Sequence, residues 1–151
     1  MRLWRIVRAP YQSLDGGGAR LNGGRWNSEG NAVVYLAATP SLAILELLVH
    51  VDVEDLPSDL ILLGVDVPDS PDVPEIRVEE LPPDWNAVAD HPACRTRGDA
   101  WIASSASLLL RVPSAVSPRE RNYVLNPAHP DATRATVASS EPFTFDRRLL
   151  Q

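Results

Sequence analysis

The sequence predicts an α+β domain. Short β-prone segments recur along the chain, only two segments have a convincing helical pattern, and the two types do not alternate as in a βαβ protein. At 151 residues the chain has the length of one ordinary domain, so we expect one core over residues 1–151 and no second domain. Apolar residues make up 44% of it and charged residues 23%, which is ordinary for a folded soluble protein.

The N-terminal part of the chain predicts a strand, a long loop and a second strand. Residues 2–8 (RLWRIVR) alternate and are β-prone, which predicts a strand with Arg5 near its middle. Residues 9–32 are rich in Gly, Asn and Ser and predict a long ordered loop or an irregular ribbon. Loops of this length in compact domains are usually functional or mobile. Residues 33–37 predict a short buried strand that carries Tyr35.

A helix is expected to begin directly after Thr39. Thr39 is a good N-cap, Pro40 suits the first turn, and no helix breaker follows before His50. The remaining predicted elements are a second helix at 95–105, weakened by Gly98, and strands at 60–67, 76–78, 107–112, 123–125 and 143–145.

The charge distribution argues against several classes of partner. The formal net charge is -6, and residues 51–90 hold 12 acidic residues against one arginine, Arg77. This acidity argues against a phosphate-neutralising surface for DNA or RNA. The acidic segment is typical of a solvated face, and the alternative is a contact with a basic partner. No apolar run approaches the roughly 18 residues that span a bilayer, and the N-terminus lacks a signal-peptide pattern. We therefore expect a cytoplasmic protein that binds neither membrane nor nucleic acid directly.

Several catalytic chemistries lack their motifs. Cys94 is the single cysteine, which excludes an internal disulfide, and the three histidines lack metal-ligand spacing, so we expect no metal. The glycines form neither a GxGxxG nor a P-loop pattern. Ser114 is not in a GxSxG elbow, and a glycosidase pair of acids is poorly supported.

Glu46 is the most unusual residue of the sequence. Residues 41–49 (SLAILELLV) are apolar nearly all round, which indicates a buried helix, and Glu46 is their only charged residue. An unpaired carboxylate in such a place is strongly unfavourable, so it needs a partner or a polar cavity. Two interpretations stay open: a buried ion pair with an arginine, or a catalytic carboxylate that faces a cleft.

Four further polar residues have a structural interpretation, and for the two arginines a functional one is given beside it. Arg5 in its strand and Arg25 in GGRWN could each form an ion pair with Glu46. Alternatively, the paired N–H donors of each guanidinium match the oxygens of a phosphate. Ser114, in VPSAV, is by default a turn serine that bonds its own backbone. Tyr35 is by default a core or edge aromatic whose hydroxyl is satisfied locally.

Taken together, these segments resemble the RES domain family, named for its Arg, Glu and Ser. The resemblance covers the chain from about residue 3 to the end, and a GGRWN followed about twenty residues later by a helical glutamate is fairly specific. The matching segments are LWRIV at 3–7, GGRWNSEGNAVVYLAATPSLAILELLVH at 23–50 and SLLLRVPSAVSPRERNYVLNPAHPD at 107–131.

The resemblance implies a fold and a function. The fold is similar to the ADP-ribosyltransferase core, a split mixed sheet with flanking helices. RES proteins are typically toxins of bacterial type II toxin–antitoxin pairs that cleave the nicotinamide–ribose bond of NAD⁺ by hydrolysis or phosphorolysis and so deplete it. The alternative is a mono-ADP-ribosyltransferase that modifies a protein, so water, phosphate and a protein side chain all stay open as acceptors. An inactive relative that only binds an antitoxin is a weaker third possibility, because every signature polar residue is present.

The resemblance also assigns roles by position. It assigns catalysis to Arg25, Glu46 and Ser114, and substrate binding to Arg5, Tyr35 and Trp26. Ile6 stands where some relatives have an aromatic residue. We expect an Xre-type antitoxin to cover the active site in a complex with two or more toxin copies, and any DNA binding to belong to the antitoxin.

Overall fold

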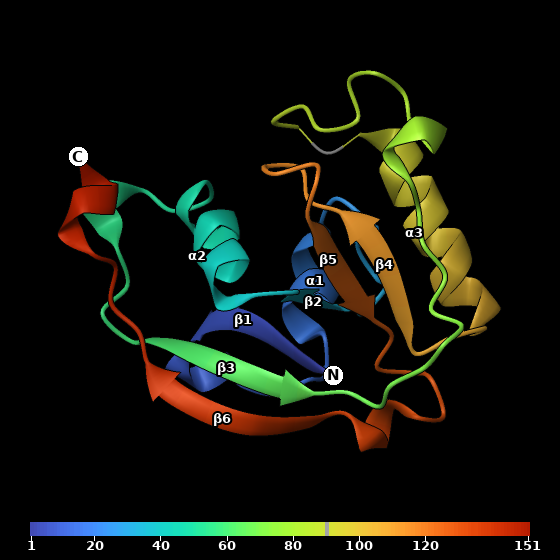
Figure 1. Ribbon diagram of the computed structural model, residues 1–151, viewed down its shortest axis with the longest axis horizontal. Helices are drawn as coiled ribbons and strands as arrows, with labels where there is room; N and C mark the ends of the chain where they lie inside the picture. The colour runs from blue at the N-terminus through green and yellow to red at the C-terminus, as the bar shows by residue number, and fades with distance from the viewer. Residues whose placement is uncertain (90) are drawn as a thin grey trace.

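The computed structural model describes residues 1–89 and 91–151; Asp90, the last acid of the predicted acidic segment, lies outside the described residues. Figure 1 shows one sheet with helices on it. The strands are β1 (Arg2–Arg8), β2 (Val34–Ala37), β3 (Leu60–Asp66), β4 (Leu109–Pro113), β5 (Arg121–Leu125) and β6 (Thr136–Pro142). The helices are α1 (Gly17–Asn22), α2 (Pro40–Leu48) and α3 (Pro92–Ser104). The predicted α+β class is confirmed.

The sheet has the order β4-β5-β2-β1-β3-β6, with antiparallel pairing between neighbours, and it divides between β1 and β2. These two strands pair at one position, Trp4 opposite Ala37. By contrast, β1 and β3 pair along their whole length, from Arg2 opposite Asp66 to Arg8 opposite Leu60. Figure 1 accordingly shows β1, β3 and β6 as one group and β2, β5 and β4 as another that turns away from it. This is the split sheet that the resemblance implied, but the named strands pair only antiparallel, and among the described residues the expected mixed character is limited to a single parallel bridge between Glu75 and Arg111.

The helices α2 and α3 lie on the same face of the sheet. Leu42 and Ala43 of α2 are buried with Ala37 of β2, and Tyr35 of β2 packs against the cluster that contains the buried residues of α3. Because Tyr35 and Ala37 are two residues apart on one strand, their side chains point to the same face. The opposite face carries the larger core cluster, which includes Leu3, Val7, Val34, Leu36, Leu63, Val65, Tyr123 and Leu125.

The helix α2 begins as predicted but is less buried than predicted. Thr39 is its N-cap, with Oγ1 accepting from the Leu42 amide at 3.1 Å, and Pro40 is its first residue. Only Leu42 and Ala43 are buried, and Val49 just after the helix is 53% exposed. The prediction of a helix buried nearly all round is therefore wrong: α2 packs mainly against β1 and β2, near the division of the sheet, and most of its side chains are only partly buried.

Three other predicted elements differ from the structure. The predicted loop at 9–32 contains α1, which begins where Asp15 Oδ1 accepts from the Gly17 amide at 2.8 Å. The last strand is β6, not residues 143–145, because β6 is an edge strand with mostly exposed side chains and so lacks an alternating pattern. The predicted strand at 76–78 is reduced to a single bridge at Glu75. No helix in the described ranges has the length and apolar character to cross a membrane.

Candidate active site

The carboxylate of Glu46 accepts hydrogen bonds from side chains in the half of the sheet that contains β2, β5 and β4. Its Oε1 accepts from Ser114 Oγ at 2.6 Å and from Asn122 Nδ2 at 2.7 Å. Glu46 lies on α2, Ser114 directly follows β4, and Asn122 lies on β5 opposite Ala37. The structure thus brings together Glu46 and Ser114, two of the three residues that the sequence assigned to catalysis, across the division of the sheet.

The ion-pair interpretation of Glu46 is wrong for this structure. Within residues 1–89 and 91–151, no arginine lies within ion-pair distance of Glu46, whose partners are the neutral groups of Ser114 and Asn122. The second oxygen, Oε2, accepts no hydrogen bond from these residues and is not among their fully buried, unpartnered side-chain atoms. Glu46 is half-buried, so Oε2 is the part of the carboxylate that stays open to solvent.

Ser114 is a turn serine that also donates a hydrogen bond to Glu46. Its side chain is fully buried, and Oγ accepts from the amides of Val116 at 3.3 Å and Ser117 at 3.0 Å, as a turn serine does. Because those amides supply two donors to Oγ, the hydroxyl proton is directed to Glu46. The turn after β4 therefore fixes the donor that holds the carboxylate.

The guanidinium of Arg5 makes no hydrogen bond to the described residues and interacts only with the charge of Asp15. Leu3 and Val7, two residues to either side on β1, belong to the large core cluster, whereas Trp4 and Ile6 pack toward α2. Burial lowers the pKa of Arg5, and the charge of Asp15 offsets part of this effect. Arg5 makes no hydrogen bond or ion pair to the described part of the chain, including Glu46. It is a partly desolvated cation that an anionic ligand would complement.

Arg25 is engaged by the protein backbone. Its Nη1 donates to the carbonyl of Trp85 at 2.8 Å, and its Nη2 donates to the carbonyl of Ala87 at 2.9 Å. The sequence predicted that the guanidinium of Arg25 is available to bind phosphate, whereas in this structure two of its donors hold the segment at residues 85–87. A phosphate at these two donors would have to replace both carbonyls.

Tyr35 and Trp26 help to fix the conformation of the glycine-rich segment at residues 9–32. The Tyr35 hydroxyl accepts from the Trp26 amide at 3.0 Å and donates to Asn27 Oδ1 at 2.6 Å, which matches the default interpretation from sequence. Trp26 is 3% exposed, and its ring lies 6.4 Å from that of Trp85. The side chain of Trp26 is a core residue, and its expected substrate-binding role stays a prediction.

Asp99 is a structural anchor that sequence reasoning missed. From α3 it accepts from the amide of Ser28 at 2.9 Å, from Ser28 Oγ, and from Asn31 Nδ2 at 2.9 Å. Burial alone would raise the pKa of Asp99, but these hydrogen bonds outweigh it and lower the pKa. An acid on a polar helix gives no sequence signal of such a role, and the bonds fix the loop that carries Arg25.

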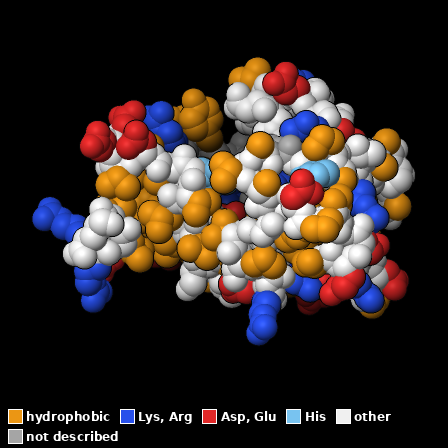
Figure 2. Space-filling view, turned by 90° about the horizontal axis from the view of Figure 1, so that it is seen from above, with side chains coloured by type: hydrophobic (Ala, Val, Ile, Leu, Met, Phe, Trp, Pro, Cys, Tyr) orange, Lys and Arg blue, Asp and Glu red, His pale blue; other side chains and the backbone are white. Residues whose placement is uncertain are grey.

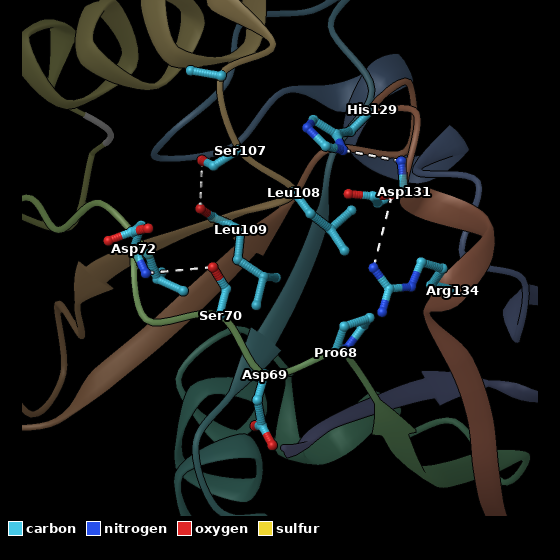
Figure 3. A pocket seen from close by; sticks show the side chains of 12 residues that line it. Pro68, Asp69, Ser70, Asp72, Ser107, Leu108, Leu109, His129, Asp131 and Arg134 are labelled. Atoms are coloured by element: carbon cyan, nitrogen blue, oxygen red, sulfur yellow. Dashed lines mark hydrogen bonds and ion pairs between the residues drawn. The ribbon is translucent and has the colours of Figure 1, made fainter.

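The surface is hollowed between the part of the molecule that carries α2 and the part that carries α3 (Figure 2). A separate depression of about 350 Å³ includes Asp69, Asp72, His129 and Asp131 in its wall, and none of the predicted site residues (Figure 3).

Among the described residues no group of three or more His, Cys, Asp or Glu side chains is arranged to hold a metal ion.

The fold and the site together define a small α+β protein whose polar centre is a helical glutamate bonded to a serine. The family model described as "RES domain" matches residues 2–146. The protein named "Toxin Res" of Pseudomonas putida is 41% identical over 151 residues, which cover 99% of both chains. The "Prs ADP-ribosylating toxin" of a Sphingobium species is 35% identical over 154 residues, which cover 98% of this chain and 96% of that protein. The chain belongs to the RES domain family.

A solved structure supports the fold independently. The Mycobacterium tuberculosis MbcT–MbcA toxin–antitoxin complex contains a chain that superposes with a TM-score of 0.78 and 21% identity, over 95% of this chain and 84% of that one. At this identity the likeness concerns the fold alone.

Proposed function

We propose that the chain is the toxin of a type II toxin–antitoxin system and cleaves the nicotinamide–ribose bond of NAD⁺. The observation that carries the proposal is the carboxylate of Glu46, with one oxygen held by Ser114 and Asn122 and the other open to solvent. A carboxylate fixed in this way is preorganised to stabilise a developing positive charge on a bound sugar. The names of the Pseudomonas and Sphingobium relatives support both the toxin role and the use of ADP-ribose chemistry.

In the proposed reaction the bond between C1′ of the ribose and the ring nitrogen of nicotinamide breaks. The electron pair of that bond stays with the nitrogen, so nicotinamide leaves as a neutral molecule and the ribosyl group becomes an oxocarbenium-like cation. Oε2 of Glu46 accepts a hydrogen bond from a ribose hydroxyl and stabilises this cation electrostatically. The oxygen of water or phosphate then bonds to C1′, and with water a proton passes to solvent.

The guanidinium of Arg5 supplies the charge expected to bind the pyrophosphate. Arg5 is partly desolvated and makes no hydrogen bond to the described residues, so phosphate oxygens would complete its hydrogen bonding. Binding energy gained at the phosphates is converted into orientation of the ribose beside Glu46. Arg5 alternates with Trp4 and Ile6, which pack toward α2, so its side chain leaves β1 on the opposite face. The substrate therefore has to pass through the division between β1 and β2 to reach both Arg5 and Glu46.

The second candidate is a mono-ADP-ribosyltransferase that uses the same site. Here a nucleophilic side chain of a target protein, in place of water or phosphate, bonds to C1′. The Sphingobium relative named as an ADP-ribosylating toxin favours this candidate. The two reactions share every step up to the departure of nicotinamide, so only the acceptor distinguishes them.

Two measurements separate the candidates. Purified protein is incubated with NAD⁺, with and without phosphate, and released nicotinamide is quantified; absence of release in both buffers refutes free cleavage. Labelled NAD⁺ is then added to a cell lysate. A labelled protein band without release in the purified system supports the transferase, and a band that persists with Glu46→Ala is not a product of this site.

We also propose an antitoxin partner for the chain. The structural neighbour is part of a toxin–antitoxin complex, and family resemblance predicts an Xre-type antitoxin that covers the active site in a complex with two or more toxins. Co-purification with the product of the adjacent gene, followed by mass measurement of the complex, tests this. Inhibition of nicotinamide release by that product tests whether it covers the site.

A further inference from the structure

One polar side-chain atom of Asn122 is hydrogen-bonded and the other is not. Its Nδ2 donates to Glu46 Oε1 at 2.7 Å. Its Oδ1 is fully buried and accepts no hydrogen bond, and it is the one such side-chain atom in the part of the chain that the structure describes. A buried acceptor without a donor destabilises the folded state, because it has lost water and gained no partner.

The position of Asn122 in the sheet gives no structural reason for an amide. Its neighbours across β5 are Ala37 on β2 and Val112 on β4, both buried and apolar. An aliphatic side chain would suit this surrounding and would leave no unsatisfied acceptor. A residue that lowers stability and contacts a candidate catalytic group is the pattern expected of a functional position.

We propose that Asn122 is a positioning residue that sets the orientation of the Glu46 carboxylate, an inference that rests on the proposed function. One hydrogen bond from Ser114 would leave the carboxylate free to rotate about that contact. A second donor from β5 to the same oxygen restricts this rotation, since one donor lies on β5 and the other in the turn after β4. Both bonds occupy Oε1, so Oε2 keeps its acceptor capacity for a ribose hydroxyl.

The chain contains a matched control in Asn126. It is 1% exposed and directly follows β5, and both of its polar atoms are satisfied by backbone. Its Nδ2 donates to the carbonyl of Ile102 at 3.5 Å, and its Oδ1 accepts from the amide of Ala128 at 3.0 Å. Asn126 is thus a structural asparagine, and removal of its amide should affect folding without affecting the orientation of Glu46.

The test compares Asn122→Leu, Asn122→Asp and Asn126→Leu by thermal unfolding and by the kcat and KM of nicotinamide release. Asn122→Leu should melt close to the wild-type temperature, because removal of the unpaired Oδ1 offsets the lost hydrogen bond to Glu46, while kcat falls on the order of a hundredfold and KM changes little. Asn122→Asp keeps the size but loses the donor, so it should lose kcat as well. Asn126→Leu should melt at a lower temperature and keep its kcat per folded molecule.

The proposal is overturned by wild-type kcat in Asn122→Leu or Asn122→Asp, or by a raised KM at unchanged kcat, which would mean direct substrate binding. If the wild-type protein releases no nicotinamide, the proposed function fails instead. The positioning contact is then tested by NMR of the side-chain amide protons. Glu46→Ala should shift the signals of Asn122 and leave those of Asn126 in place, and unshifted Asn122 signals would overturn the inference.

Discussion

Gly98 of α3 is the position where the smallest change should have the largest effect on the fold. A Cβ at this residue would lie 1.7 Å from the carbonyl oxygen of Trp26, 2.6 Å from its carbonyl carbon and 3.0 Å from its Cα. All three atoms are backbone, so no side-chain rotation relieves the overlap. The substitution Gly98→Ala therefore requires α3 and the loop that carries Arg25 to move apart by more than an ångström.

The expected destabilisation follows from two opposing effects. Displacement of closely packed backbone costs about 3 kcal/mol, at the upper end of overpacking effects. Replacement of glycine by alanine inside a helix contributes up to about 1 kcal/mol in the other direction. The net loss is about 2 kcal/mol, which for a domain of this size lowers the melting temperature by roughly 4–8 °C.

Thermal and urea unfolding measure this loss directly, and Gly18→Ala in α1 is the matched control. A Cβ at Gly18 meets nothing within 4 Å, so this variant should be as stable as the wild type or slightly more stable. A Gly98→Ala protein that melts at or above the wild-type temperature would refute the argument that the loop and α3 are in contact as described.

Three further predictions concern the site and its supports. Glu46→Gln keeps the shape and removes the charge, so nicotinamide release should fall at least about a hundredfold in a protein that still folds; wild-type release contradicts this. Arg25→Lys replaces a guanidinium that donates to two carbonyls by a single ammonium, so protease cleavage at residues 85–87 should accelerate. Unchanged cleavage contradicts the prediction that Arg25 holds this segment. Because hydrogen bonds from Ser28 lower the pKa of Asp99 against the effect of burial, its stabilisation is complete above about pH 4 and is lost as the pH falls through the folded pKa. The stability gap between wild type and Asp99→Asn should therefore shrink in acid, and a gap that does not change with pH refutes it.

Local sequence signals predicted the elements that have local causes. The N-cap of α2 at Thr39, the strand β1 and the strand β3 follow from capping chemistry and alternation, which a few neighbouring residues determine. Gly98 shows the limit of such signals. By helix propensity it weakens α3, but its contact with Trp26, 72 positions away in the chain, makes glycine necessary. The edge strand β6 was missed for a related reason, since its pairing with β3 leaves its side chains in solvent.

The candidate site was predicted in its chemistry more than in its contacts. A single acid in an apolar helix correctly identified Glu46 as a residue with special partners, but arginine was the expected partner and Ser114 with Asn122 are the observed ones. Nothing in the pattern of RNYVL distinguishes Asn122 from a solvent-facing residue at the start of a strand. Its contact with Glu46 depends on the pairing of β2 with β5 and on the position of α2 over β2, which are long-range features.

The two arginines that sequence reasoning treated alike differ in what a phosphate would gain from them. Hydrogen bonds from Arg25 already satisfy two backbone carbonyls, so a phosphate at those donors would leave both carbonyls to find water or new partners. Arg5 has lost part of its hydration and, among the described residues, has gained only the charge of Asp15 and no hydrogen bond, so an incoming anion displaces no protein acceptor there. Arg5 is therefore the stronger candidate for the first contact with the pyrophosphate, while Arg25 holds the segment at Trp85.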